Sequence, residues 1–212
     1  MKRHNALLTI TAFAAALALT AIANVSAQQP PKISPELVDQ YVKRTWSAPP
    51  SGWQARVDQD EAQALCSRYR NELPVADFER LVAREKATIV FPADGNVLGD
   101  WKAGERIAQT GTGGQFSDRD NTPRGGNCYA CHQMASKELS YGTLGPSLTE
   151  YGKIRKFAPE EAKAAFAKIY NSQSVLPCSN MPRFGYHKFL SEQQIKDVTA
   201  YLFDPESPVN KP

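Results

Sequence analysis

Two cysteines and a histidine stand together near the middle of the chain, in a C-x-x-C-H run at residues 128–132. This spacing is the attachment signature of c-type haem, because two thiols on one turn can each add to a vinyl group of the porphyrin. The histidine that follows can then reach the iron as its proximal ligand. We therefore expect one covalent haem c, held by Cys128 and Cys131, with His132 on the iron.

Two other chemistries use paired cysteines at this spacing. A thioredoxin-like redox pair does not need the following histidine and belongs in a βαβ unit, and the sequence has no strand-like alternation of useful length. A zinc site needs a second pair of ligands. Haem attachment is the interpretation that uses all three side chains.

The iron also needs a sixth ligand, or it keeps an open position. Met134 is only two residues past His132, so it cannot reach the opposite haem face. Met181 lies 49 residues after His132, in a loop between two expected helices, and its thioether can reach round the haem edge. We predict Met181 as the distal ligand. His187, an open site, and a Met181 that only fills a gap in the core are the alternatives.

The proposed ligand pair has a consequence for chemistry. His/Met ligation raises the reduction potential and leaves no free coordination position, which favours electron transfer over peroxide or oxygen chemistry. A proximal histidine usually donates its other ring N–H to a carbonyl, which sets its orientation. We expect the carbonyl of Pro146, in the Gly-Pro turn at residues 144–148, to accept that hydrogen bond, with an ordinary turn as the alternative.

Cys66 and Cys178 remain once the haem has taken the other two cysteines. In an oxidising compartment we predict a disulfide between them. It would tie the N-terminal part of the chain to the loop that carries Met181. Free buried thiols, or a reactive Cys178 near the haem, are the alternatives.

The first 27 residues have the pattern of a cleaved secretory signal peptide. A short basic start leads into an Ala- and Leu-rich stretch at residues 6–23, followed by a small-x-small pattern at 25–27. A retained anchor is the alternative, but the stretch is near the lower limit of about 20 residues for a span. We expect a periplasmic protein without a membrane span.

Charge and hydrophobicity exclude two classes of function. The leader contains two of the 25 basic residues and none of the 22 acidic ones, so the mature chain has a net charge of +1. This balance excludes a nucleic-acid binder driven by bulk charge. A hydrophobic content of 42% excludes a disordered acidic tail protein.

The remaining pattern predicts an all-α chain in two parts, a helical N-terminal extension at residues 28–96 and a haem domain at 97–212. Caps and apolar periodicity predict helices that cover residues 60–70, 74–87, 159–170 and 191–203. Two further helices are expected to begin near residue 34 and at residue 100. In the helix after Asp100, Gly104 is expected to permit close packing against Tyr201 and Leu202. The Gly-rich stretch at 111–126 is expected to be a flexible surface loop.

Several stretches of the haem domain resemble the SoxX family of monohaem cytochromes. They are the haem motif at 126–133, Gly-Pro-Ser-Leu at 145–148 with Tyr-Gly at 151–152, Met-Pro-Arg-Phe-Gly at 181–185 and Asp-Pro-Glu-Ser-Pro-Val at 204–209. The last two motifs are the most specific, and the resemblance covers about residues 99–210. It implies a class I cytochrome c fold preceded here by an extension that is longer than expected.

The resemblance also implies partners. Members of this family form a periplasmic heterodimer with SoxA, a haem protein with a cysteine-derived iron ligand. The complex couples thiosulfate oxidatively to a cysteine of the SoxYZ carrier, an L-cysteine S-thiosulfotransferase activity whose catalytic site lies on SoxA. The SoxX-type haem is then a non-catalytic relay, which passes electrons to a small soluble cytochrome.

A free-standing electron carrier is the main competing function, and a purely structural role is the weakest one. The extension distinguishes between these functions, because its amphipathic helices must bury their apolar faces on the haem domain or on a partner. We expect a partner to cover part of that surface. A nearly neutral chain has little long-range steering, which also suits a permanent complex.

Overall fold

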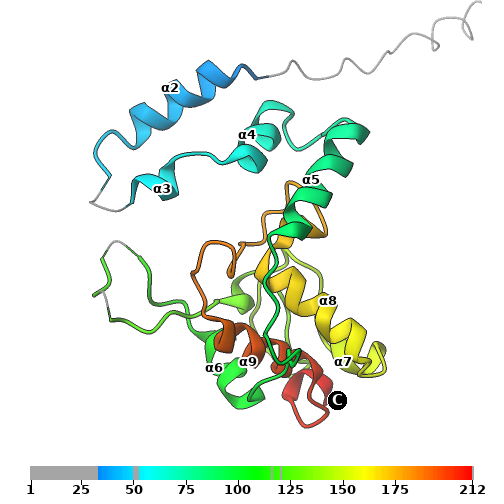
Figure 1. Ribbon diagram of the computed structural model, residues 1–212. Helices are drawn as coiled ribbons and strands as arrows, with labels where there is room; N and C mark the ends of the chain where they lie inside the picture. The colour runs from blue at the N-terminus through cyan, green and yellow to red at the C-terminus, as the bar shows by residue number, and fades with distance from the viewer. Residues whose placement is uncertain (1–32, 50–52, 116, 120, 212) are drawn as a thin grey trace, which may run out of the picture. The chain divides into compact units, whose positions relative to one another are not determined.

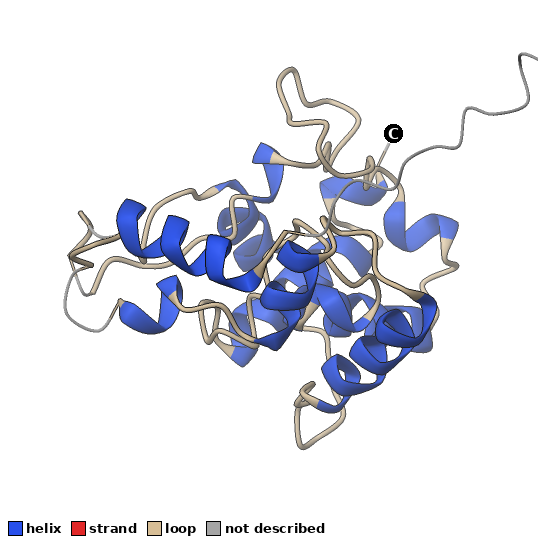
Figure 2. Ribbon diagram, turned by 90° about the horizontal axis from the view of Figure 1, so that it is seen from above, coloured by secondary structure: helices blue, strands red, loops and turns tan. Residues whose placement is uncertain are grey.

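The computed structural model describes residues 33–49, 53–115, 117–119 and 121–211, and the predicted signal peptide lies outside these ranges. The described residues form helices joined by loops, with no β-strand among them, so the predicted all-α class is confirmed (Figures 1 and 2). The α-helices are α2 (Pro35–Thr45), α3 (Gln54–Val57), α4 (Glu61–Arg68), α5 (Val75–Ala87), α6 (Trp101–Gln109), α7 (Tyr151–Ile154), α8 (Pro159–Tyr170) and α9 (Glu192–Phe203). Three short 3₁₀ helices complete the set, η1 (Cys128–Ala130), η2 (Ser172–Ser174) and η3 (Pro208–Asn210).

The helices begin where local capping chemistry places them. The Ser34 hydroxyl accepts the Leu37 N–H at 3.2 Å at the start of α2. At the start of α9, Ser191 and Gln194 form a reciprocal capping box that satisfies two otherwise unpaired N–H groups. The short helices α3, α7, η2 and η3 were not predicted, because a single turn has too few residues to show a period.

The main core forms where α6 packs against α9, with α8 against the other side of α9. Gly104 makes the first contact possible. A Cβ atom at Gly104 would lie 2.0 Å from the carbonyl oxygen of Asp197 and 2.9 Å from the Cβ of Tyr201. The predicted close approach to Tyr201 is therefore present, and the nearest backbone is that of Asp197 rather than Leu202.

Hydrogen bonds of Asn210, near the C-terminus, connect the end of α9 to the start of α7. The side-chain amide of Asn210 donates to the carbonyls of Leu202 at 3.1 Å and Asp204 at 2.9 Å. Its oxygen accepts the backbone N–H groups of Gly152 and Lys153. These bonds satisfy free groups at the end of α9 and the start of α7.

Two helices of the extension pack on the chain itself. Ala62 and Cys66 of α4 and Leu81 of α5 form a second buried cluster, and α5 also lies against η2. The apolar residues of α5 are not all buried, because Val75 is 74% exposed, whereas the charged Glu85 is buried. In contrast, α2 buries none of its residues, and its Tyr41 is 70% exposed.

None of the helices within the described ranges has the length and apolar character that a bilayer crossing requires.

Candidate functional site

The C-x-x-C-H run forms one tight turn. Residues 128–130 are the helix η1, and the carbonyl of Cys128 accepts the N–H groups of Cys131 at 3.1 Å and His132 at 2.9 Å. Neither motif cysteine takes part in a disulfide. The turn therefore holds two thiols and one imidazole close together, as attachment to one ligand requires.

The turn is fastened to the main core by the two residues that precede Ala130. Cys128 and Tyr129 pack against the core cluster, and the Tyr129 hydroxyl lies 2.7 Å from the hydroxyl of Tyr201 in α9. Burial raises the pKa of the Cys128 thiol to about 12, so this thiol is protonated at neutral pH.

The orientation of His132 is set by the segment that follows it. Its Nδ1 lies 2.7 Å from the carbonyl oxygen of Pro146. Because a carbonyl only accepts, Nδ1 carries the proton, and the lone pair of Nε2 is left available for a metal. This contact is the one expected for Pro146.

Two glycines allow that segment to lie so close to the motif. A Cβ at Gly145 would be 2.1 Å from Cε1 of His132, and one at Gly142 would be 1.8 Å from the carbonyl oxygen of Ala130. The Gly145 N–H also donates to the carbonyl of Cys131 at 2.8 Å. Any larger residue at position 145 would displace the imidazole ring.

The two candidates for a sixth ligand, Met181 and His187, and the excluded Met134 lie in different surroundings. Met134 is 1% exposed and belongs to the main core. Met181 is partly buried and packs against the same core cluster as Cys128. The ring of His187 meets Tyr186 edge-on, and burial followed by the positive charge of Arg183 lowers its pKa, so its imidazole is neutral at pH 7.

Comparison with known proteins identifies the family. The family profile described as Cytochrome c matches residues 99–204, which is half of the chain. The chain belongs to the cytochrome c family. It is also 40% identical over 156 residues to an uncharacterized lipoprotein of Aquifex aeolicus (strain VF5), covering 72% of this chain and 73% of that protein. That alignment is longer than residues 99–212, so the similarity extends into the part of the chain that precedes the cytochrome c match.

Membership of this family confirms the class I cytochrome c fold and an electron-transfer haem protein with covalently bound haem c. The residues present fit that group. Two cysteines outside the disulfide stand on one turn, the histidine after them has its Nδ1 on a carbonyl, and the surrounding core is apolar. A soft thioether is also available at Met181, on the same core.

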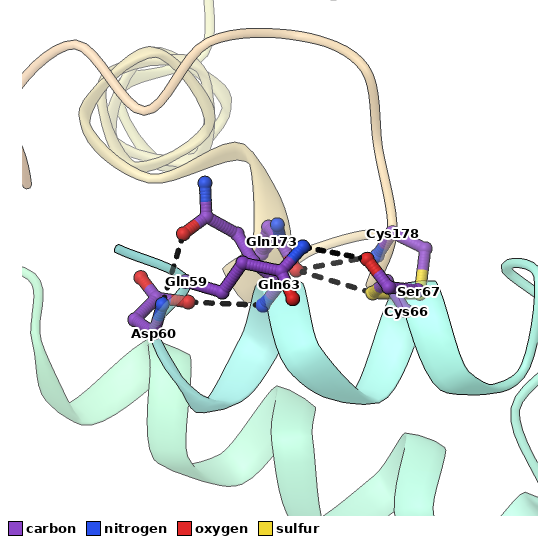
Figure 3. The surroundings of a disulfide bond; sticks show 7 residues. All are labelled: Gln59, Asp60, Gln63, Cys66, Ser67, Gln173 and Cys178. Carbon is purple, nitrogen blue, oxygen red and sulfur yellow. Dashed lines mark hydrogen bonds between the residues drawn. A yellow bond between two sulfur atoms is a disulfide. The ribbon is translucent and has the colours of Figure 1, made fainter. Parts of the chain in front are cut away.

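Cys66 and Cys178 form a disulfide that joins α4 to the loop before Met181 (Figure 3). The side chain of Gln173 lies beside it, and its Oε1 accepts the Cys178 N–H at 3.2 Å. Nearby, Gln59 donates to the hydroxyl of Ser67, the residue after Cys66, at 2.8 Å.

A buried charge cluster next to this disulfide was missed by the sequence reasoning. Arg183 pairs with Asp60 and lies 3.5 Å from a carboxylate oxygen of Glu85, which is 0% exposed. Asn171 donates to that same oxygen at 2.8 Å. Burial raises the pKa of Asp60, but hydrogen bonds from the Gln63 N–H and Arg183 outweigh it and hold the pKa below its usual value.

A sequence signal for this cluster did exist. Glu85 lies four residues after Leu81, on the inward face of α5, where a charged residue needs a buried partner. One partner is the adjacent Arg84, which lies 3.3 Å from the other carboxylate oxygen, but Arg183 is 98 residues away in the chain, so no local pattern identifies it.

Proposed function

We propose that this protein is a periplasmic cytochrome with a single haem c, and that it relays electrons as the SoxX-type subunit of a thiosulfate-oxidising complex. In this proposal residues 97–212 are the haem domain and residues 28–96 the extension. The observation that carries the relay role is the arrangement of His132 on the Pro146 carbonyl with Met181 on the same core as Cys128.

Each residue has a defined task in this proposal. Cys128 and Cys131 hold the haem through thioether bonds, and His132 binds the iron through Nε2. The Pro146 carbonyl keeps Nδ1 protonated and increases the basicity of the ligand. Met181 occupies the distal side.

When bound, haem c supplies a one-electron redox centre. If His132 and Met181 both bound the iron, no coordination position would remain for a substrate. Cys128 and Met181 pack on an apolar core cluster, which would limit the access of water to that part of the haem. Substrate chemistry is therefore assigned to a partner, a SoxA-like cytochrome, and the electron acceptor is a small soluble cytochrome.

The partner assignment is supported by two features of this chain. The Met-Pro-Arg-Phe-Gly and Asp-Pro-Glu-Ser-Pro-Val motifs are the basis of the resemblance to SoxX, and SoxX-type subunits act with SoxA on a SoxYZ-like carrier. The exposed apolar residues of α2, among them Leu37 and Tyr41, leave an extension surface that a partner can cover. Export is supported by the N-terminal pattern and by the disulfide.

A free-standing carrier is the second candidate, because α4 and α5 bury their apolar residues on their own chain. Because that packing already buries these apolar residues, it leaves less exposed apolar surface for a partner to cover.

A purification from the natural host tests the proposal. The mature protein with a C-terminal tag is isolated from the periplasm at high salt. We expect a second c-type cytochrome in a stoichiometric ratio, and haem reduction that requires both thiosulfate and the added carrier protein. Omission of either thiosulfate or the carrier is the control. A monomer whose haem is not reduced under these conditions, but exchanges electrons with soluble cytochromes, would establish the second candidate instead.

A further inference from the structure

We propose that α4 and α5 of the extension brace the segment at residues 178–183 and thereby position Met181 on the distal side of the haem. This inference rests on the proposed function, in which Met181 is an iron ligand. The brace consists of two anchors, one on each side of Met181 in the chain.

The first anchor is covalent and lies before Met181. The disulfide attaches Cys178, three residues upstream, to Cys66 in α4. Cys178 has a positive φ of 60°, and Gln173 fixes its N–H from η2. The backbone that leads into Met181 is thus held by α4 and by η2 together.

The second anchor is electrostatic and lies after Met181. Arg183, two residues downstream, has a side chain that is only 4% exposed. It points between Asp60, at the start of α4, and Glu85, in α5. Asn171, just before η2, completes the cluster through its bond to Glu85. Within the described residues, both carboxylates that pair with Arg183 therefore come from the extension.

The segment needs these anchors because little else holds it. It contains no helix, and the local bonds at Met181 are one from the Ser172 hydroxyl to its carbonyl at 2.6 Å and one from its N–H to the Ser179 hydroxyl at 3.2 Å. A cavity of about 630 Å³ adjoins it, lined by Met181, His187 and Cys178 among others. Packing on that side leaves space into which the segment can move.

A buried ion cluster is a poor source of stability, since desolvation offsets most of the Coulomb attraction. It does specify geometry, because any shift of Arg183 away from its partners leaves a buried charge unpaired. The cluster therefore opposes the displacement that would take Met181 off the iron.

Competition with an added iron ligand measures how strongly the cluster opposes the displacement of Met181 from the iron. In the ferric haem protein, free imidazole binds the iron only when Met181 has left it, so its apparent Kd reports the fraction of displaced Met181. The visible absorption characteristic of methionine on ferric haem gives an independent reading.

Glu85→Gln keeps the shape of the side chain and removes its charge. The double variant with Cys66→Ser and Cys178→Ser removes the disulfide, which is the other anchor. It provides the test if the Glu85→Gln protein does not fold. Asp77→Asn is the matched control, since Asp77 is a carboxylate of the same helix whose partner, Arg80, lies on the surface. We expect imidazole to bind each brace variant about tenfold more tightly than the wild type, equivalent to about 1.4 kcal/mol, with no change for Asp77→Asn.

The outcomes are distinguishable. If the wild type shows methionine ligation and the brace variants bind imidazole as it does, even with a lowered Tm, the cluster is only structural and the inference is overturned. If the wild-type ferric haem lacks methionine ligation, the proposed ligand set fails, and the brace fails with it. Tighter imidazole binding in the brace variants, with unchanged binding in Asp77→Asn, supports the inference.

Discussion

Replacing Gly104 by alanine should loosen the packing of α6 on α9. The added methyl carbon would lie 2.0 Å from the Asp197 carbonyl oxygen and 2.5 Å from its carbonyl carbon. These are backbone atoms in the middle of α9, so they cannot rotate away as a side chain can. One helix must move outward by about 1 Å or more to restore a normal contact distance of roughly 3.5–4 Å.

Two effects of opposite sign set the magnitude. Alanine is favoured over glycine in a helix interior by about 1 kcal/mol. Overpacking costs about 1–3 kcal/mol, and the backbone contact places Gly104 at the upper end of that range or beyond it. The net result is a loss of about 2 kcal/mol in the free energy of unfolding. For a chain of this size the Tm should fall by about 4–8 °C.

Thermal unfolding of the haem-loaded protein, followed by circular dichroism, measures this change. Lys102→Ala, at an exposed position of the same helix, is the control and should stay within about 0.5 kcal/mol of the wild type. A Gly104→Ala protein with a Tm equal to or above that of the wild type would refute the reasoning, because helix propensity would then outweigh the contact.

Three further predictions concern the haem site. Gly145→Ala should push the His132 ring away from the Pro146 carbonyl, and weaker proximal ligation should show as a changed reduction potential in a redox titration; an unchanged potential would contradict the contact. Met181→Ala should abolish methionine ligation and lower the reduction potential, whereas an unaltered spectrum would exclude Met181 as the ligand. Loss of the Cys66–Cys178 disulfide, which links residues 112 apart, should reduce the free energy of unfolding by roughly 4–5 kcal/mol in chemical denaturation, and an unchanged midpoint would show that the bond does not restrain the unfolded chain.

Local chemistry accounts for what the sequence predicted about the fold. Ser34 and Ser191 begin their helices because a side-chain oxygen can satisfy an N–H two or three residues away, which is a short-range effect. The C-x-x-C-H spacing is short-range too, so the turn at residues 128–132 follows from the residues themselves. The single-turn helices α3 and α7 could not be predicted, because a single turn is too short to show a helical period in the sequence.

Long-range packing accounts for what the sequence could not show. Val75 and Leu81 are both apolar residues of α5, yet only Leu81 is buried, because it packs against Ala62 and Cys66 of α4. Glu85 and Arg183 likewise become partners only when α5 meets the loop after Met181.

By itself, the sequence determined the helical class, the helix starts and the haem-attachment turn, since each depends on neighbours within a few residues. The count of cysteines also predicted the disulfide between Cys66 and Cys178, which the structure contains. Only the tertiary structure decided that a buried charge cluster holds the extension on the same Met181 loop. The partners in that cluster lie about a hundred residues apart in the chain, so no local pattern contains the information.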